Sequence, residues 1–130
     1  MNRRILVIED DQGCESILRR VIHSLDSDAK VDWEESVENA VDALQRQHAQ
    51  GHDYDLIIAD IFLSGRKTGL ELWQSYRDNY PDIPMLIVSS LSPDRFFSSI
   101  GAETIAPPFL PKPFHAGECK QMIEGLLAYN

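Results

Sequence analysis

The sequence lacks any apolar run near the roughly 18 residues that a membrane-spanning helix needs, so we expect no insertion into a membrane. A cleavable signal is also missing, because acidic residues follow the first apolar run at once in MNRRILVIEDD. We therefore expect a cytoplasmic protein. No linker, internal repeat or low-complexity segment divides the chain, which predicts one domain over residues 1–130.

Basic residues and cysteines are scarce as well. Lys and Arg number 12 against 21 Asp and Glu, and the net charge of −9 argues against direct nucleic-acid binding, because phosphate backbones attract cations. The two cysteines, Cys14 and Cys119, lack the spacing of a metal or redox motif. We expect both to be reduced and partly buried in a cytoplasmic protein.

The pattern that remains is a regular alternation of strands and helices. Short apolar or alternating stretches, typical of strands, occur at residues 4–8, 29–35, 55–59, 84–90 and 105–110. Apolar positions at helical spacing follow each of them. The third helical segment spans residues 69–80, and the fourth begins at Ser92 and ends near Gly101. Five successive βα units with continuous apolar strands predict an α/β fold, in which a parallel sheet carries helices on both faces.

Several residues are expected at element boundaries. Asp11, Ser36 and Ser92 each precede a helical pattern and carry an oxygen that can cap its first turn. Pro107 and Pro108 interrupt the last apolar stretch, and prolines are tolerated on the edge strands of sheets. The fifth strand is therefore predicted to be weak and to lie at an edge.

Polar side chains collect where the predicted strands end. Ligands bind outside the carboxyl ends of the strands in open parallel sheets, so residues at these ends should share one site. The ends of the first, third and fourth strands and the residues after the fifth are Glu9-Asp10-Asp11, Asp60, Ser89-Ser90 and Lys112-Pro113.

This group suits one kind of chemistry. Neighbouring carboxylates repel one another, and a divalent cation removes the repulsion. Hard oxygen ligands without His or Cys favour Mg²⁺ over zinc. Such a site with a lysine and a hydroxyl suits a phosphoryl group, and Asp60 could be its nucleophile, since carboxylates form aspartyl-phosphates. Any one of these residues alone has an ordinary structural explanation, such as a turn or a helix cap. No single structural explanation accounts for all four features at the four strand ends.

These residues make the sequence similar to the response regulator receiver domains of two-component signalling. The resemblance rests on the acidic pair in ILVIEDD, the Asp in DLIIADIFLSGRKTGLEL, the hydroxyl in MLIVSS and the KPF in LPKPF. It covers essentially the whole chain. It implies a flavodoxin-like (βα)5 fold, doubly wound, with a five-stranded parallel sheet in the order 2-1-3-4-5. Residues 1–130 are expected to be a single receiver domain without an effector domain.

The resemblance assigns a metal and phosphoryl site. Asp60 matches the phosphoacceptor, Asp10 the acid that binds Mg²⁺ directly, and Glu9 the acid that acts through water. The backbone carbonyl of Phe62 is expected to be a further metal ligand. At two positions that commonly border the approach of water to the phosphorus, this chain has Phe62 and Leu91, which we expect to prolong the phosphorylated state.

The remaining family positions concern the response to phosphorylation. Ser89 matches the hydroxyl that binds the phosphoryl group and moves toward it, and Lys112 matches the lysine that pairs with it. Phe109 matches the aromatic that rotates with Ser89, and Pro113 the proline that follows a cis peptide bond.

The chain departs from the family pattern in a few places. Glu9 stands where Asp is commoner, and Ser64 stands where a proline is typical. The stretch from Asp60 to Gly69 is one residue longer than usual, and the stretch from Gly101 to Lys112 is also extended.

The resemblance implies a phosphoacceptor signalling domain rather than an enzyme. Its expected partners are a histidine kinase or phosphotransfer protein and a downstream protein target, and homodimer formation stays open. A phosphorylation-independent adaptor is the main alternative. A phosphatase would need a second Asp where Phe62 stands, and a flavodoxin would need a loop rich in Ser, Thr and Gly in place of EDDQG.

Overall fold

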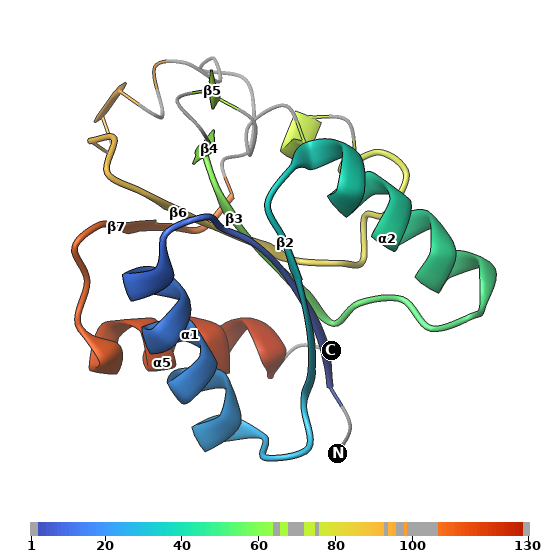
Figure 1. The fold of residues 1–130 in the computed structure, drawn as a ribbon, viewed down its shortest axis with the longest axis horizontal. Coiled ribbons are helices and arrows are strands. Elements are labelled where there is room, and N and C mark those ends of the chain that lie inside the picture. The colour runs from blue at the N-terminus through green and yellow to red at the C-terminus, as the bar shows by residue number, and fades with distance from the viewer. Residues whose placement is uncertain are drawn as a thin grey trace.

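A computed structural model describes residues 3–63, 66–67, 72–74, 76–92, 94–95, 98 and 107–128. Five parallel strands form one sheet in the order β2-β1-β3-β6-β7 (Figure 1). Along the chain, β6 and β7 are the fourth and fifth strands of this sheet. The predicted flavodoxin-like fold with the order 2-1-3-4-5 is therefore confirmed. The strands are β1 (Arg4–Ile8), β2 (Lys30–Glu34), β3 (Leu56–Asp60), β6 (Met85–Ser89) and β7 (Phe109–Pro111).

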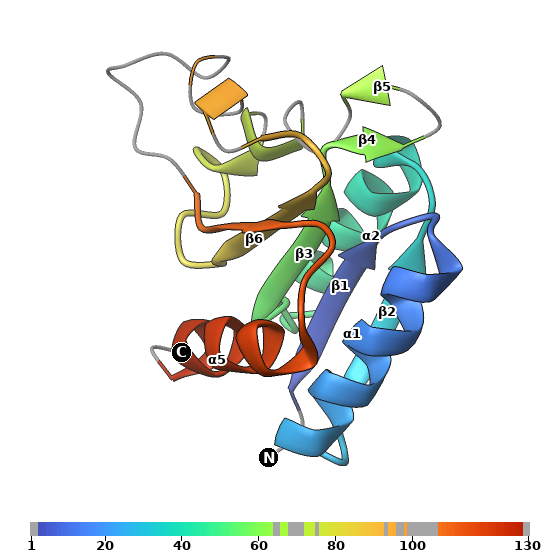
Figure 2. The same ribbon diagram turned by 90° about the vertical axis from the view of Figure 1, so that its left-hand side faces the viewer.

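Three helices are described in full, and they cover both faces of the sheet. Helices α1 (Gln12–Leu25) and α5 (Ala116–Leu127) lie together on one face, and α2 (Val37–Ala49) lies on the other (Figures 1 and 2). Asp11 caps α1 by accepting hydrogen bonds from the backbone N–H groups of Gly13 and Cys14, and Ser36 caps α2 in the same way. Both expected caps are thus confirmed.

The sheet separates two apolar cores because successive side chains of a strand point to opposite faces. In β1, Leu6 and Ile8 pack into the core under α2, whereas Ile5 and Val7 pack into the core under α1 and α5. Every residue of β3 and β6 is buried, as the continuous apolar runs predict for strands covered on both faces. Both cysteines are free, and both are buried rather than partly buried as expected.

The structure also departs from the expected elements. A two-stranded ribbon, β4 (Phe62–Leu63) with β5 (Arg66–Lys67), follows Asp60 and was not predicted. β7 starts at Phe109, directly after two prolines whose missing N–H groups cannot pair in a sheet. Residues 105–106 of the predicted strand lie outside the described residues.

The structure describes residues 72–74 and 76–80 of the helix predicted at 69–80, and residues 92, 94, 95 and 98 of the helix predicted at 92–101. Residues 77–79 form a turn, so the first of these helices does not continue to Tyr80 as predicted. In the part that is described, residues 72–74 and 76 are helical, and Trp73 and Tyr76 are buried as their spacing predicts. The hydroxyl of Ser92 accepts a hydrogen bond from the backbone N–H of Arg95 at 3.3 Å, which agrees with the expected cap. Within the described part of the chain, no helix has both the length and the apolar character to cross a lipid bilayer.

Candidate functional site

The register of the sheet brings the ends of four strands to the same edge. Ile8 of β1 lies beside Ala59 of β3, so the residues that follow them, Glu9 and Asp60, are neighbours. Across the sheet, Ser89 of β6 lies beside Pro111 of β7. The backbone N–H of Lys112 donates to the carbonyl of Ser89 at 2.7 Å, which fixes the start of the loop after β7.

Three carboxylates converge at this edge. Glu9, Asp10 and Asp60 each place one carboxylate oxygen within 4.8 Å of the others. Glu9 and Asp60 are only 3% and 6% exposed, whereas Asp10 is open to solvent. Two buried carboxylates and one exposed carboxylate together form a set of hard oxygen donors. This set fits Mg²⁺, which proteins usually hold with one or two carboxylates while the ion keeps several waters. The expected ligand from the Phe62 carbonyl stays a prediction.

Lys112 balances part of this negative charge. Its ammonium donates one hydrogen bond to the Glu9 carboxylate and another to Oδ2 of Asp60, the latter at 3.0 Å. Burial alone would lower the pKa of Lys112, but these two hydrogen bonds outweigh it and raise the pKa above its ordinary value. The side chain is therefore a permanent cation at neutral pH.

Cys14 is a neighbour of the acids that sequence reasoning did not identify. Burial raises the pKa of Glu9, although hydrogen bonds from the Cys14 thiol and the Lys112 ammonium oppose the shift. Burial and the nearby Glu9 carboxylate raise the pKa of Cys14 in turn, so the thiol stays protonated. Helical spacing from Leu18 and Val21 indicates that Cys14 points inward. The sequence carries no sign of its contact with Glu9.

Ser89, the last residue of β6, and Ser90, which follows it, have different surroundings. Ser89 is fully buried, and its hydroxyl accepts a hydrogen bond from the backbone N–H of Leu91 at 3.0 Å. Ser90 is exposed and lines the pocket beside the acids. Leu91 is half-buried and packs against the core under α2. The family match identified Ser89 as the phosphoryl-binding hydroxyl. The sequence itself does not indicate which of the two adjacent serines, Ser89 or Ser90, lines the pocket.

The pocket beside these residues has a volume of about 510 Å³. One part of its wall is polar, with Asp10, Asp11, Asp60, Ser90 and Lys112. The other part is formed mainly by Cys14, Ile17, Pro113 and Phe114. The space is larger than one phosphoryl group needs, so a larger donor can approach Asp60 through it.

The remaining predicted site residues lie after or within β7. The peptide bond between Lys112 and Pro113 is cis, as the family match implies. Phe109 is half-buried and packs against the core under α2, the same core that Leu91 contacts. In the sheet Phe109 lies beside Ile87 of β6, and its role as a switch stays a prediction.

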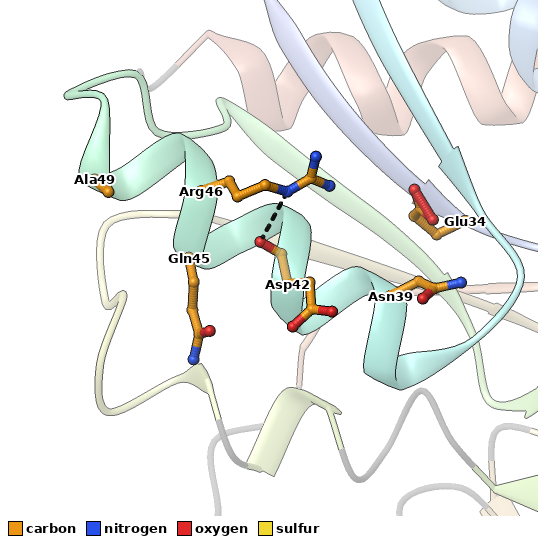
Figure 3. A pocket seen from close by; sticks show the side chains of 6 residues that line it. All are labelled: Glu34, Asn39, Asp42, Gln45, Arg46 and Ala49. Carbon is orange, nitrogen blue, oxygen red and sulfur yellow. Dashed lines mark hydrogen bonds between the residues drawn. The ribbon is translucent and has the colours of Figure 1, made fainter.

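A second pocket, of about 470 Å³, lies between α2 and the end of β2. Figure 3 shows Asn39 and Arg46 extending from α2 on the side where Glu34 lies. Arg46 is the one cation among its lining residues, and its Nε donates to the carbonyl oxygen of Asp42 at 3.4 Å. Among the described residues, none lines both this pocket and the pocket beside Asp60.

Comparison with known proteins gives a consistent result. The family pattern described as "Response regulator receiver domain" matches residues 5–124. Among curated proteins no match was found. Many solved structures are similar to this chain.

A response regulator receiver domain protein (CheY-like) from Methanospirillum hungatei is 16% identical, with a TM-score of 0.77, and the alignment covers 98% of this chain and 95% of that one. The non-phosphorylated HemR receiver domain from Leptospira biflexa is 28% identical, with a TM-score of 0.72 and the same coverage of 98% and 95%. The phosphorylated cyanobacterial phytochrome response regulator RcpA is 18% identical, with a TM-score of 0.74 and coverage of 97% and 91%.

Proposed function

The chain belongs to the response regulator receiver domain family of two-component signalling, and we propose that it accepts a phosphoryl group on Asp60 from a histidine kinase or phosphotransfer protein. The observation that carries this proposal is the arrangement around Asp60. Its carboxylate is nearly buried, lies within 4.8 Å of two other carboxylates and accepts a hydrogen bond from a lysine ammonium. A carboxylate in such surroundings suits phosphoryl transfer better than a structural role.

The proposed cofactor is Mg²⁺. Glu9, Asp10 and Asp60, with the backbone carbonyl of Phe62, would hold the ion. When bound, Mg²⁺ supplies positive charge that offsets the carboxylates and the oxygens of an incoming phosphoryl group. The donor set contains oxygens alone, which favours Mg²⁺ over a softer metal.

The transfer itself would use Asp60 and Lys112. A carboxylate oxygen of Asp60 attacks the phosphorus, the bond from phosphorus to the donor's imidazole nitrogen breaks, and the nitrogen keeps the electron pair. Lys112 already contacts Oδ2 of Asp60, so its ammonium can follow the new negative charge onto a phosphoryl oxygen. Because its pKa is raised, Lys112 remains charged throughout.

The proposed output is a change of protein surface. A phosphoryl group on Asp60 would draw the hydroxyl of Ser89 away from the Leu91 N–H that it now accepts from. Phe109 and Leu91 pack against the same core, so a shift near Ser89 can be passed on to both side chains. Phosphorylation would then shift the population of one face, and a downstream protein would bind that face.

Incubation with phosphoramidate or acetyl phosphate and Mg²⁺ tests the proposal. We expect one phosphoryl group in the intact mass, and its loss in hydroxylamine, as for an acyl phosphate. Asp60→Asn should abolish the label, whereas Asp78→Asn, at an exposed position away from the site, should keep it. A label that persists in Asp60→Asn at the level of the unchanged protein would overturn the assignment.

A further inference from the structure

Ser89 is the last residue of β6 and Ser90 follows it, and of these two serines Ser90 lines the pocket beside Asp60. Ser89 is fully buried, and its oxygen already accepts the Leu91 N–H. Ser90 is exposed and lines the pocket together with Asp60 and Lys112. A molecule that enters this pocket therefore meets Ser90, whereas Ser89 is enclosed.

The negative charge of the pocket opposes the binding of an anion, so a neutral hydrogen-bond donor at this position would favour binding. Its wall carries three carboxylates, Asp10, Asp11 and Asp60, which repel an anionic phosphodonor. The Lys112 ammonium opposes them, but it is already bonded to Glu9 and Asp60. A second group that can donate to phosphoryl oxygens would help an anion to bind before Lys112 moves.

Ser90 is suited to that task. Among the described side chains that line the pocket, hydrogen-bond donors are found at Cys14, Ser90 and Lys112. The thiol of Cys14 is a weak donor and is bonded to Glu9. The Ser90 hydroxyl can donate its proton to a phosphoryl oxygen and still accept from water through its lone pairs.

We propose that Ser90 is a substrate-binding residue of this site, whose hydroxyl donates a hydrogen bond to a phosphoryl oxygen of the incoming donor and of the phosphoryl group on Asp60. This inference rests on the proposed function. The bond between Asp60 and phosphorus forms as the bond between phosphorus and the leaving group breaks, and the leaving group keeps the electron pair. Ser90 keeps its proton in the covalent step and is neither nucleophile nor base.

The experiment compares three substitutions at one position. Ser90→Val and Ser90→Thr have nearly the same shape, but only threonine carries a hydroxyl, and Ser90→Ala removes the hydroxyl without adding bulk. The second-order rate constants for labelling by phosphoramidate and by acetyl phosphate would be measured with saturating Mg²⁺. Affinity for beryllium fluoride, a phosphoryl analogue, would be measured by fluorine NMR as a readout of binding alone.

We expect Ser90→Val and Ser90→Ala to lower both rate constants about tenfold, the lower end for a hydrogen bond to a charged group. Both donors should be affected equally, because they share the phosphoryl oxygens and differ in the leaving group. Ser90→Thr should recover most of the rate that Ser90→Val loses. Beryllium fluoride affinity should fall in the same order, while Mg²⁺ affinity and the thermal midpoint should not change, since Ser90 is not a proposed metal ligand.

Equal rates for Ser90→Val and Ser90→Thr, with all variants folded, would overturn the inference, because the hydroxyl would then make no contact. A parallel fall in Mg²⁺ affinity would also overturn it, since the effect would then arise at the metal. Failure of the proposed function is a different result: the unchanged protein would carry no label on Asp60 with either donor.

Discussion

The ammonium of Lys112 joins Asp60 to Glu9, because Nζ donates to Oδ2 of Asp60 at 3.0 Å and to the carboxylate of Glu9 as well. The three groups come from the ends of β3, β1 and β7, which are far apart in sequence. One cation thus links two buried carboxylates that would otherwise repel each other. Under the proposed function, Mg²⁺ would bind the same acids, so Lys112 and the metal would both contribute to neutralising them.

The first prediction concerns Lys112→Ala. Removal of the ammonium leaves Glu9 and Asp60 buried without their cation, and we expect the metal-free protein to lose about 3 kcal/mol of unfolding free energy, as when one partner of a buried ion pair is removed. Mg²⁺ should restore part of the loss, because it supplies positive charge to the same carboxylates. Urea denaturation with and without Mg²⁺ measures both effects.

The matched control is Lys120→Ala, which removes an exposed lysine from α5. It should change the unfolding free energy little and independently of Mg²⁺. Equal stability of Lys112→Ala and Lys120→Ala would show that the ammonium is not needed to hold the two acids together.

The second prediction concerns Mg²⁺ and stability. A ligand that binds the folded state alone stabilises it, by about 1.4 kcal/mol at a tenfold excess over its Kd. We expect the thermal midpoint to rise with Mg²⁺ and the rise to be largely lost in Asp10→Asn, since Asp10 is the solvent-exposed member of the acidic cluster. Asp42→Asn is a suitable control, because Asp42 lines the separate pocket beside α2 and should leave the response intact. A full response in Asp10→Asn would contradict the proposed ligand set.

The third prediction concerns alkaline pH. Burial raises the pKa of the Cys119 thiol from 9.0 to about 11. The folded state therefore holds this proton more tightly than the unfolded state, so the contribution of Cys119 to stability is present below about pH 9 and is lost as the pH rises toward 11. The loss should be about 3 kcal/mol at most, because one pKa unit corresponds to about 1.4 kcal/mol.

Urea denaturation between these pH values, on the unchanged protein and on Cys119→Ala, tests this linkage. Cys119→Ala should be less stable at neutral pH because it leaves a small cavity, but its stability should fall less steeply with pH. Identical slopes for the two proteins would mean that Cys119 titrates alike in the folded and unfolded states.

The fold was predictable because its signals are local and mutually consistent. Continuous apolar runs identify β1, β3 and β6, and the caps at Asp11 and Ser36 follow from residue type and spacing. The convergence of Glu9, Asp60 and Lys112 follows from topology, since parallel strands end at one edge.

The parts that were missed depend on side-chain direction or on tertiary pairing. The ribbon of β4 and β5 needs a pairing that no alternation in so short a segment reveals. Ser89 and Ser90 are identical in type and adjacent, so only the path of the backbone after β6 decides which one faces the pocket. Likewise, the contact of Cys14 with Glu9 depends on how α1 packs over the end of β1.

The fourth prediction concerns the lifetime of the phosphoryl group. By the family resemblance, Phe62 and Leu91 are expected at the two positions that commonly border the approach of water to the phosphorus, and apolar side chains cannot orient a water molecule by hydrogen bonding. We expect the double substitution Phe62→Asn and Leu91→Glu to shorten the lifetime roughly tenfold, because a polar group that positions the water assists its attack. Decay of the label after removal of the donor measures this directly.

The single substitutions separate the contributions of the two positions. Leu91 packs against the core under α2, so Leu91→Glu is expected to lower stability as well as lifetime. Phe62→Asn tests the position two residues after the acceptor by itself. Leu91→Ala separates the loss of bulk from the added polar group, because it removes the same packing without adding a carboxylate. If Leu91 shields the phosphorus, its decay should lie between those of the unchanged protein and of Leu91→Glu. If the double variant decays no faster than the unchanged protein, these two side chains do not shield the phosphorus.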